Sequence, residues 1–112
     1  MKKIFALLSG ALFLFACNQF GKKDKVTGKD RIVCVSKQLT ELMFVLHQGD
    51  KIVGVDLTST YPAETKNITK VGYHRHLSAE GIISLDPTVV IHQNDVAPPE
   101  VMPQIAKVGI PV

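Results

Sequence analysis

Two short apolar runs rich in β-branched residues constrain the fold most, because a helical segment separates them. The runs are residues 31–35 and 51–55, and each is typical of a buried strand. Ser36 is a candidate N-cap, and Gly49 is predicted to end the helix. The apolar residues between them recur at helical spacing and predict one buried face: Leu39, Leu42, Met43 and Leu46. Strand, helix and strand predict a parallel, right-handed βαβ unit.

The rest of the chain continues this alternation. Residues 88–91 predict a third buried strand, with His92 at its carboxyl end. Before it, Ser78 is predicted to cap a short helix that Asp86-Pro87 stops. After it, Pro98-Pro99 is predicted to open a helix, with Glu100 in its first turn. The residues spaced for the buried side of that helix are Val101, Ile105 and Val108.

The last residues predict that this α/β fold continues beyond the sequence. Gly109 closes the final helix, and residues 110–112 resemble the beginning of a strand. Parallel sheets need helices on both faces, which 31–112 alone provides only in part. We therefore expect residues 31–112 to be the incomplete N-terminal lobe of a longer protein, with a complete small domain as the alternative.

The first 16 residues predict a secretory signal peptide. Lys2 and Lys3 form a charged start, and residues 4–15 form an apolar core. Such a core is too short to span a bilayer of roughly 30 Å as a helix. Residues 14–17, Leu-Phe-Ala-Cys, resemble the lipobox of bacterial lipoproteins. That resemblance implies cleavage before Cys17 and acylation of its thiol, which would anchor the protein to a membrane on its extracytoplasmic side.

Charge and cysteine usage agree with this organisation. Residues 17–30 are polar and lysine-rich, and they predict a flexible linker after the lipid anchor. From residue 22 to 31 there are five basic residues against two acidic, whereas 32–112 holds six against eight. The basic character therefore belongs to the tether and does not indicate a nucleic-acid face. Cys34 lies in an apolar run and is interpreted as a small buried hydrophobe without a disulfide partner.

The stretch 71–82 has the densest set of groups that could hold a metal or a charged ligand. Tyr73, His74, Arg75 and His76 follow one another there. A tyrosine phenolate is an established ligand of ferric haem iron, and a nearby cation favours the phenolate. If these residues are extended, Tyr73 and Arg75 share one face and the two histidines project from the other. The pattern alone leaves an exposed polar turn as the alternative.

Histidines allow a second interpretation of the same stretch. His74 and His76 could together hold a metal such as zinc, although no cysteine or nearby acidic residue completes a ligand set. His92 is placed where ligands bind in open α/β sheets, outside the carboxyl ends of strands. A metal-dependent hydrolase that uses these three histidines is therefore an alternative to a binding protein.

Several motifs together resemble the N-terminal lobe of the haem-binding proteins of bacterial haem ABC importers, within the vitamin B12 and siderophore binding-protein group. The resemblance extends from Arg31 to Val112. The motifs are Arg31-Ile32-Val33, Gly54-Val55-Asp56, Thr58-Ser59-Thr60-Tyr61-Pro62, Val71-Gly72-Tyr73 with Arg75, Leu77-Ser78-Ala79-Glu80-Gly81 and Pro98-Pro99-Glu100. The resemblance implies a two-lobed, helix-linked substrate-binding protein of which this chain is the first lobe.

The resemblance also implies roles for single residues. The family tyrosine after Val-Gly is the axial haem ligand and the arginine two residues on pairs with it, which corresponds to Tyr73 and Arg75. Histidines at 74 and 76 depart from the commoner pattern and leave open a contribution to ligation. A family glutamate on each lobe contacts permease arginines, and Glu100 matches the position in this lobe. Tyr61 precedes Pro62 and is interpreted as part of the loop structure.

The sequence therefore predicts a monomeric, lipid-anchored extracytoplasmic protein that captures haem and delivers it to an ABC permease, without catalysis. Tyr73 would hold the iron and Arg75 would support it, with His74, His76 and His92 as further candidates for the haem site. A corrinoid or a ferric siderophore is the alternative cargo.

Overall fold

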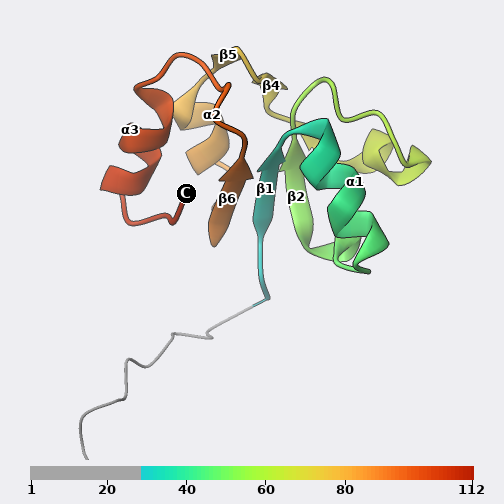
Figure 1. The fold of residues 1–112 in the computed structure, drawn as a ribbon. Helices are drawn as coiled ribbons and strands as arrows, with labels where there is room; N and C mark the ends of the chain where they lie inside the picture. The colour runs from blue at the N-terminus through green and yellow to red at the C-terminus, as the bar shows by residue number, and fades with distance from the viewer. Residues whose placement is uncertain (1–28) are drawn as a thin grey trace, which may run out of the picture.

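A parallel sheet of four strands organises the part of the chain that the structure describes. The computed structural model describes residues 29–112, so the predictions on the signal peptide and on Cys17 lie outside it. The strand order is β3-β2-β1-β6, and every neighbouring pair is parallel (Figure 1). The strands are β1 (Ile32–Val35), β2 (Ile52–Val55), β3 (Thr69–Lys70) and β6 (Val89–His92). The predicted α/β lobe with a parallel sheet is confirmed.

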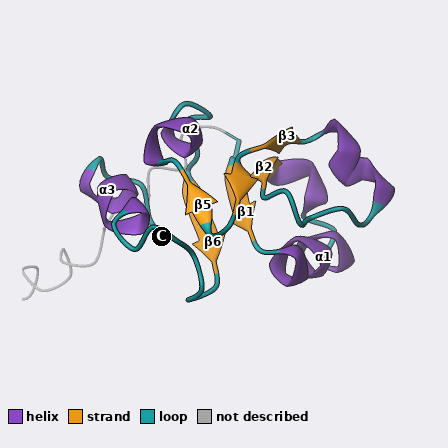
Figure 2. Ribbon diagram, turned by 90° about the horizontal axis from the view of Figure 1, so that it is seen from above, coloured by secondary structure: helices purple, strands orange, loops and turns teal. Residues whose placement is uncertain are grey.

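Helices cover both faces of this sheet. Helix α1 (Lys37–Val45) lies over one face, and α2 (Ala79–Ile83) and α3 (Val101–Lys107) lie over the other (Figure 2). The remaining elements are two 3-10 helices, η1 (Gly49–Lys51) and η2 (Ala63–Asn67), and a hairpin of β4 (Gly72–Tyr73) and β5 (His76–Leu77). Among residues 29–112, no helix has both the length and the apolar character needed to cross a membrane.

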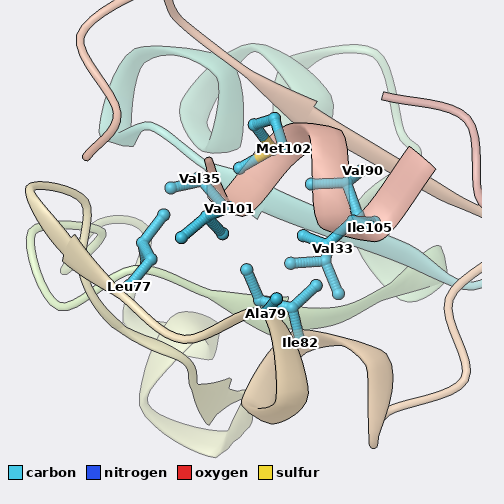
Figure 3. Packing of buried hydrophobic residues seen from close by; sticks show 9 residues of the cluster. All are labelled: Val33, Val35, Leu77, Ala79, Ile82, Val90, Val101, Met102 and Ile105. Carbon is cyan, nitrogen blue, oxygen red and sulfur yellow. The ribbon is translucent and has the colours of Figure 1, made fainter. Parts of the chain in front are cut away.

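The alternation of side chains along β1 divides the core into two clusters. Val33 and Val35 point toward α2 and α3, where they join Ile82 and Ile105 (Figure 3). Cys34 belongs to the other cluster, with partly buried residues of α1. All four residues of β1 are buried, which explains its continuous apolar run. The burial of a side chain as large as Ile82 contributes about 1.5–3 kcal/mol.

Helix α1 begins where the sequence predicted, and of the residues predicted for its buried face Leu39 and Met43 pack against the core. The Ser36 side chain accepts a hydrogen bond from the Leu39 amide, as a capping residue should. Thr40 is the fully buried residue of the helix, whereas Leu42 and Leu46 are 50% and 55% exposed. The prediction that these two leucines are buried is wrong: Phe44 packs against the sheet cluster instead, and the buried Thr40 hydroxyl donates to the Ser36 carbonyl oxygen and lies 3.0 Å from the Ser59 hydroxyl.

The predicted end of α1 at Gly49 is also wrong. The helix ends at Val45, and His47 adopts a left-handed backbone with a φ of 56°. Gly49 instead begins η1, and the Phe44 ring lies so close to it that a Cβ at this position would collide with the ring. Close packing, and not helix termination, therefore requires glycine at 49.

Helix α3 begins later than predicted. It starts at Val101, with Glu100 as the N-cap residue, so Pro98-Pro99 precedes the helix. Val101 and Ile105 are buried as predicted, but Val108 is 60% exposed and Met102 is buried in its place. Beyond the helix, the Val90 amide donates to the Pro111 carbonyl oxygen at 2.9 Å. The prediction that residues 110–112 begin a strand is wrong for the described structure, since this contact beside β6 extends into no strand.

Arg31 joins the start of the sheet to the turn before β6. Its guanidinium donates to the carbonyl oxygens of Leu85 and Asp86 at 2.7–3.2 Å, and its amide donates to the Thr88 hydroxyl. These carbonyl groups follow α2 and have left the helical hydrogen-bond pattern. Arg31 therefore has a structural role at the end of the sheet opposite the hairpin.

Candidate functional site

The β4–β5 hairpin lies at the carboxyl edge of the parallel sheet, between the loops that follow β2 and β6 (Figure 1). On one side, the Leu57 amide donates to the Gly72 carbonyl oxygen at 2.9 Å. On the other, the Ala97 amide donates to the His74 carbonyl oxygen at 2.9 Å. Ligands of open α/β sheets bind outside the carboxyl ends of strands, so this edge is the candidate site.

The hairpin replaces the extended run that the sequence argument assumed for residues 73–76. Gly72 enters it with a φ of 110°, which glycine adopts without strain. Tyr73 pairs with His76 across the two strands, and residues 74 and 75 form the turn. The prediction that Tyr73 and Arg75 share a face by strand alternation is therefore wrong. Instead, Tyr73 and His76 are directly opposite each other in the antiparallel pair.

Three residues of the hairpin, Tyr73, Arg75 and His76, have side chains exposed to solvent. The Tyr73 side chain is accessible, since the residue is 42% exposed. Arg75 and His76 are exposed as well, and their side chains make no hydrogen bond or ion pair to the residues the structure describes. A phenol, a guanidinium and an imidazole are therefore available at this edge to a ligand that approaches from solvent.

His74 lies differently, because its side chain turns toward the lobe. The side chain is only 18% exposed, and its Nδ1 lies 3.5 Å from an Asp56 carboxylate oxygen. Its Nε2 lies 3.5 Å from a carboxylate oxygen of Asp95. The Tyr73 and His74 rings meet edge to face, with centroids 4.4 Å apart. Each ring nitrogen of His74 therefore faces a carboxylate of the protein.

The sequence reasoning did not identify Asp56 as part of the site. Asp56 follows β2 and is fully buried, and its carboxylate accepts hydrogen bonds from the Ser59 hydroxyl at 2.6 Å and from the Thr58 amide at 3.2 Å. The Thr58 hydroxyl also donates to it. A carboxylate directly after a buried strand, followed by two hydroxyl residues, was the available signal, because such residues satisfy a buried charge.

A hollow of about 250 Å³ opens beside His74 at this edge. Its lining comes from the start of α1 and from the loops after β2 and β6: Val35, Ser36, Lys37, Gln38, Thr58, His74, Gln93 and Asp95. His92 does not line it, and its Nδ1 lies 2.9 Å from the Gln93 carbonyl oxygen. At the end of β6, the hollow is therefore lined by Gln93 and Asp95, which come after His92 in the sequence, and not by His92 itself.

The three histidines considered for a metal hydrolase do not come together. Within residues 29–112, no three side chains of histidine, cysteine, aspartate or glutamate are arranged to hold a metal ion. Cys34 is buried and has no disulfide partner in this part of the chain. Burial raises the pKa of its thiol to about 11, so the neutral thiol persists at ordinary pH. Its interpretation as a buried apolar residue is confirmed.

Glu100 lies in a separate groove between α2 and α3. The groove has a volume of about 360 Å³, and Glu80 and Glu100 both line it, together with Pro98 and Gln104. Both glutamates are exposed. Glu80 lies in the first turn of α2, where a carboxylate interacts favourably with the helix dipole. The geometry therefore offers two carboxylates at this surface, of which the sequence argument singled out one.

Comparisons with known proteins place this lobe in a family. Residues 32–112 match the family described as periplasmic binding protein. The chain belongs to this family. Membership confirms the prediction of a binding protein and disfavours the hydrolase alternative, since the family is defined by binding. The matched range covers all the helices and strands of the described lobe.

Three relatives illustrate the range of the periplasmic binding protein family. The solved structure of the periplasmic haem-binding protein RhuT from Roseiflexus sp. RS-1 is 47% identical, with a TM-score of 0.73, over 75% of this chain and 32% of that one. An ABC transporter substrate-binding lipoprotein of Bacillus subtilis, YvrC, is 37% identical over 73% of this chain and 26% of its own length. A vitamin B12-binding protein of Yersinia pestis is 30% identical over 74% and 30%. The chain thus spans about a third of these relatives or less.

Proposed function

We propose that this lobe captures haem on the extracytoplasmic side of a bacterial membrane, as part of a substrate-binding protein that delivers haem to an ABC permease. The observation that supports this most directly is the exposed phenol of Tyr73, on a hairpin at the carboxyl edge of the sheet. A phenolate is a hard anionic ligand that suits ferric haem iron. The name of the relative RhuT, a haem-binding protein at 47% identity, points the same way.

The other candidates have supporting roles in this proposal. Arg75 lies two residues after Tyr73, exposed in the hairpin turn, where its charge can favour the phenolate or meet a haem carboxylate. His76 lies opposite Tyr73 in the hairpin and is available as a further contact to the porphyrin or iron. His92 is farther from the hollow and is proposed only as an outer contact.

The second candidate function is the binding of a different cargo, either a corrinoid or a ferric siderophore. The vitamin B12-binding protein of Yersinia pestis matches nearly the same part of this chain, which favours a corrinoid. A ferric siderophore belongs to the same group of cargoes. Neither of these cargoes requires a phenolate at position 73, so that residue separates the hypotheses.

The test is a titration of ferric haem and, separately, of cobalamin into the protein, followed by visible absorption. We expect haem to bind with a phenolate-to-iron spectrum, and Tyr73→Phe to lose that spectrum because the phenyl ring has no oxygen to donate. Tyr61→Phe is the matched control, since Tyr61 is 68% exposed in the neighbouring loop. An unchanged spectrum in Tyr73→Phe, or tight binding of cobalamin without binding of haem, contradicts the proposal.

Delivery requires a membrane anchor and a docking surface. We propose that the acylated Cys17 holds the protein at the membrane and that the protein acts as a monomer. Glu100 is the proposed contact to permease arginines, from the groove it shares with Glu80. The relative YvrC is named as an ABC transporter substrate-binding lipoprotein, which supports both the anchor and the transporter.

A further inference from the structure

His74 links the hairpin to two separate loops of the lobe. Its Nδ1 faces Asp56, which follows β2, and its Nε2 faces Asp95, which follows β6, each at 3.5 Å. The two contacts use both ring nitrogens. An imidazole coordinates a metal through a ring nitrogen, so iron would have to replace one of these two carboxylates as the neighbour of His74.

The inner contact of His74 is fixed by a buried network. Asp56 is fully buried and accepts hydrogen bonds from the residues that follow it, and the Ser59 hydroxyl lies 3.0 Å from the Thr40 hydroxyl of α1. In the described chain, no buried side-chain nitrogen or oxygen lacks a partner. A satisfied polar network in a low-dielectric interior fixes the geometry of its members. His74 is therefore tied to the rigid part of the lobe.

The backbone of the hairpin is bonded to the same two loops. Gly72 accepts from the loop after β2, and His74 accepts from the loop after β6. The Leu77 amide in turn donates to the Ala97 carbonyl oxygen at 2.9 Å. The His74 side chain thus adds two contacts between elements that these three backbone hydrogen bonds already connect.

The contact with Tyr73 makes this connection relevant to the binding site. The rings are adjacent, with an interplanar angle of 61°. Edge-to-face packing restricts the orientation of an aromatic ring. A phenol that is held in one orientation loses less conformational freedom when it binds a ligand, which increases affinity.

We propose that His74 is a positioning residue that orients the Tyr73 phenol through Asp56 and Asp95, and that it is not a ligand of the cargo. The consequence for the cargo rests on the proposed function, because it assumes that Tyr73 ligates haem iron. The restraint on the hairpin does not depend on the cargo. Loss of the His74 nitrogens should weaken binding and leave the iron ligand unchanged.

The first experiment uses His74→Phe, which keeps an aromatic ring and removes both nitrogens. Ferric haem is titrated into the wild-type protein and the variant, and the visible spectrum is recorded. We expect haem affinity to fall by about tenfold, as for a lost contact within a coupled network, with the wild-type spectrum retained. A changed ligand spectrum, or an unchanged affinity, would overturn the proposal.

A second variant tests the pathway through Asp95. Asp95→Asn weakens the outer contact, and the Asp95 side chain is 45% exposed, so folding should be retained. We expect a smaller loss of affinity that is not additive with His74→Phe, because both substitutions break one connection. Asp50→Asn removes an exposed carboxylate of η1 away from the hairpin and is the matched control. Full additivity of the two losses would contradict the proposed connection.

A readout without haem separates this proposal from the proposed function. Amide hydrogen exchange of the apoprotein should become faster in His74→Phe at residues 72–77 and stay unchanged in β1 and α3. If the wild-type protein does not bind haem, the proposed function fails while this result still supports or refutes the role of His74. Unchanged exchange across residues 72–77 would refute it.

Discussion

The sheet core and the β4–β5 hairpin are held by different forces. Every residue of β1 is buried, and hydrophobic clusters cover both of its faces. The hairpin consists of two strands of two residues each, and only Leu77 among these four is buried. Leu77 packs in the same hydrophobic cluster as Ile105, whereas backbone hydrogen bonds and the His74 contacts hold the rest of the hairpin. The comparison indicates that stability and binding depend on separate residues in this lobe.

The largest effect on the free energy of unfolding is expected when a core side chain is truncated. This variant tests whether stability and binding depend on separate residues. Ile105 of α3 is fully buried against the sheet, so Ile105→Ala leaves a cavity there. We expect the free energy of unfolding to fall by about 2–5 kcal/mol, measured by urea denaturation of the apoprotein. The haem spectrum of the molecules that remain folded should be unchanged, because Leu77 is the hairpin residue that joins this cluster and Tyr73 lies outside it.

Val108→Ala is the matched control on the same helix. Val108 is 60% exposed, although its spacing predicted burial. We expect its stability to stay within about 0.5 kcal/mol of wild type. Equal losses in the two variants would show that α3 packs by the face that the sequence predicted. An altered haem spectrum in Ile105→Ala would show that the core and the hairpin are coupled.

The parts of the fold that the sequence predicts are those set by local patterns. The strands β1, β2 and β6 form where the apolar runs predicted them, and Ser36 and Ser78 cap their helices as predicted. Both signals, the pattern of apolar residues and the capping side chain, lie within a few residues of sequence. The face of α1 was not predictable in this way. That face meets groups that are distant in sequence, such as the Ser59 hydroxyl, which contacts Thr40 from 19 residues away.

The candidate site was predicted only in part, for the same reason. The stretch 73–76 was singled out by its composition, but its conformation depends on hydrogen bonds from loops that follow two different strands. His74 is also far in sequence from its two partners, Asp56 and Asp95. The hydroxyl residues after Asp56 were the local signal that its carboxylate is buried, but its contact with His74 has no local signal, so Asp56 was considered only as part of a motif.

The Cys34 thiol is a reactive group that burial in the sheet core keeps inactive. Desolvation raises the pKa of the Cys34 thiol to about 11, above its value in the unfolded chain. Below the unfolded pKa this difference stabilises the fold fully, and the stabilisation is lost as the pH rises through the folded value. We expect the free energy of unfolding to fall by about 2–3 kcal/mol between pH 8 and 12, measured by urea denaturation.

Cys34→Ala isolates this contribution, because lysine and tyrosine side chains titrate in the same range. The difference between wild type and variant should shrink with pH, and iodoacetamide should label native Cys34 slowly at pH 8. Rapid labelling of the folded protein at pH 8 would show that the core opens at β1. The interpretation of the sheet as the rigid part of the lobe would then be wrong.

The smallest effect on stability, and the most specific one on function, is expected at the groove between α2 and α3. Glu100 makes no side-chain capping bond and is exposed, so Glu100→Ala should change the free energy of unfolding by less than about 0.5 kcal/mol. Glu80 lies across the same groove in the first turn of α2, where its carboxylate also favours the helix. Comparison of the two alanine variants therefore separates docking from helix stabilisation.

Transport of haem into cells that contain the permease distinguishes the two glutamates. If Glu100 contacts permease arginines, Glu100→Ala should reduce uptake while haem affinity in solution stays at the wild-type value, because Glu100 does not line the hollow beside His74. Charge reversal in Glu100→Lys should reduce uptake further, since like charges would then face each other across the contact. A loss of uptake confined to Glu80→Ala would assign the contact to α2, and normal uptake in both variants would remove this groove as the docking surface.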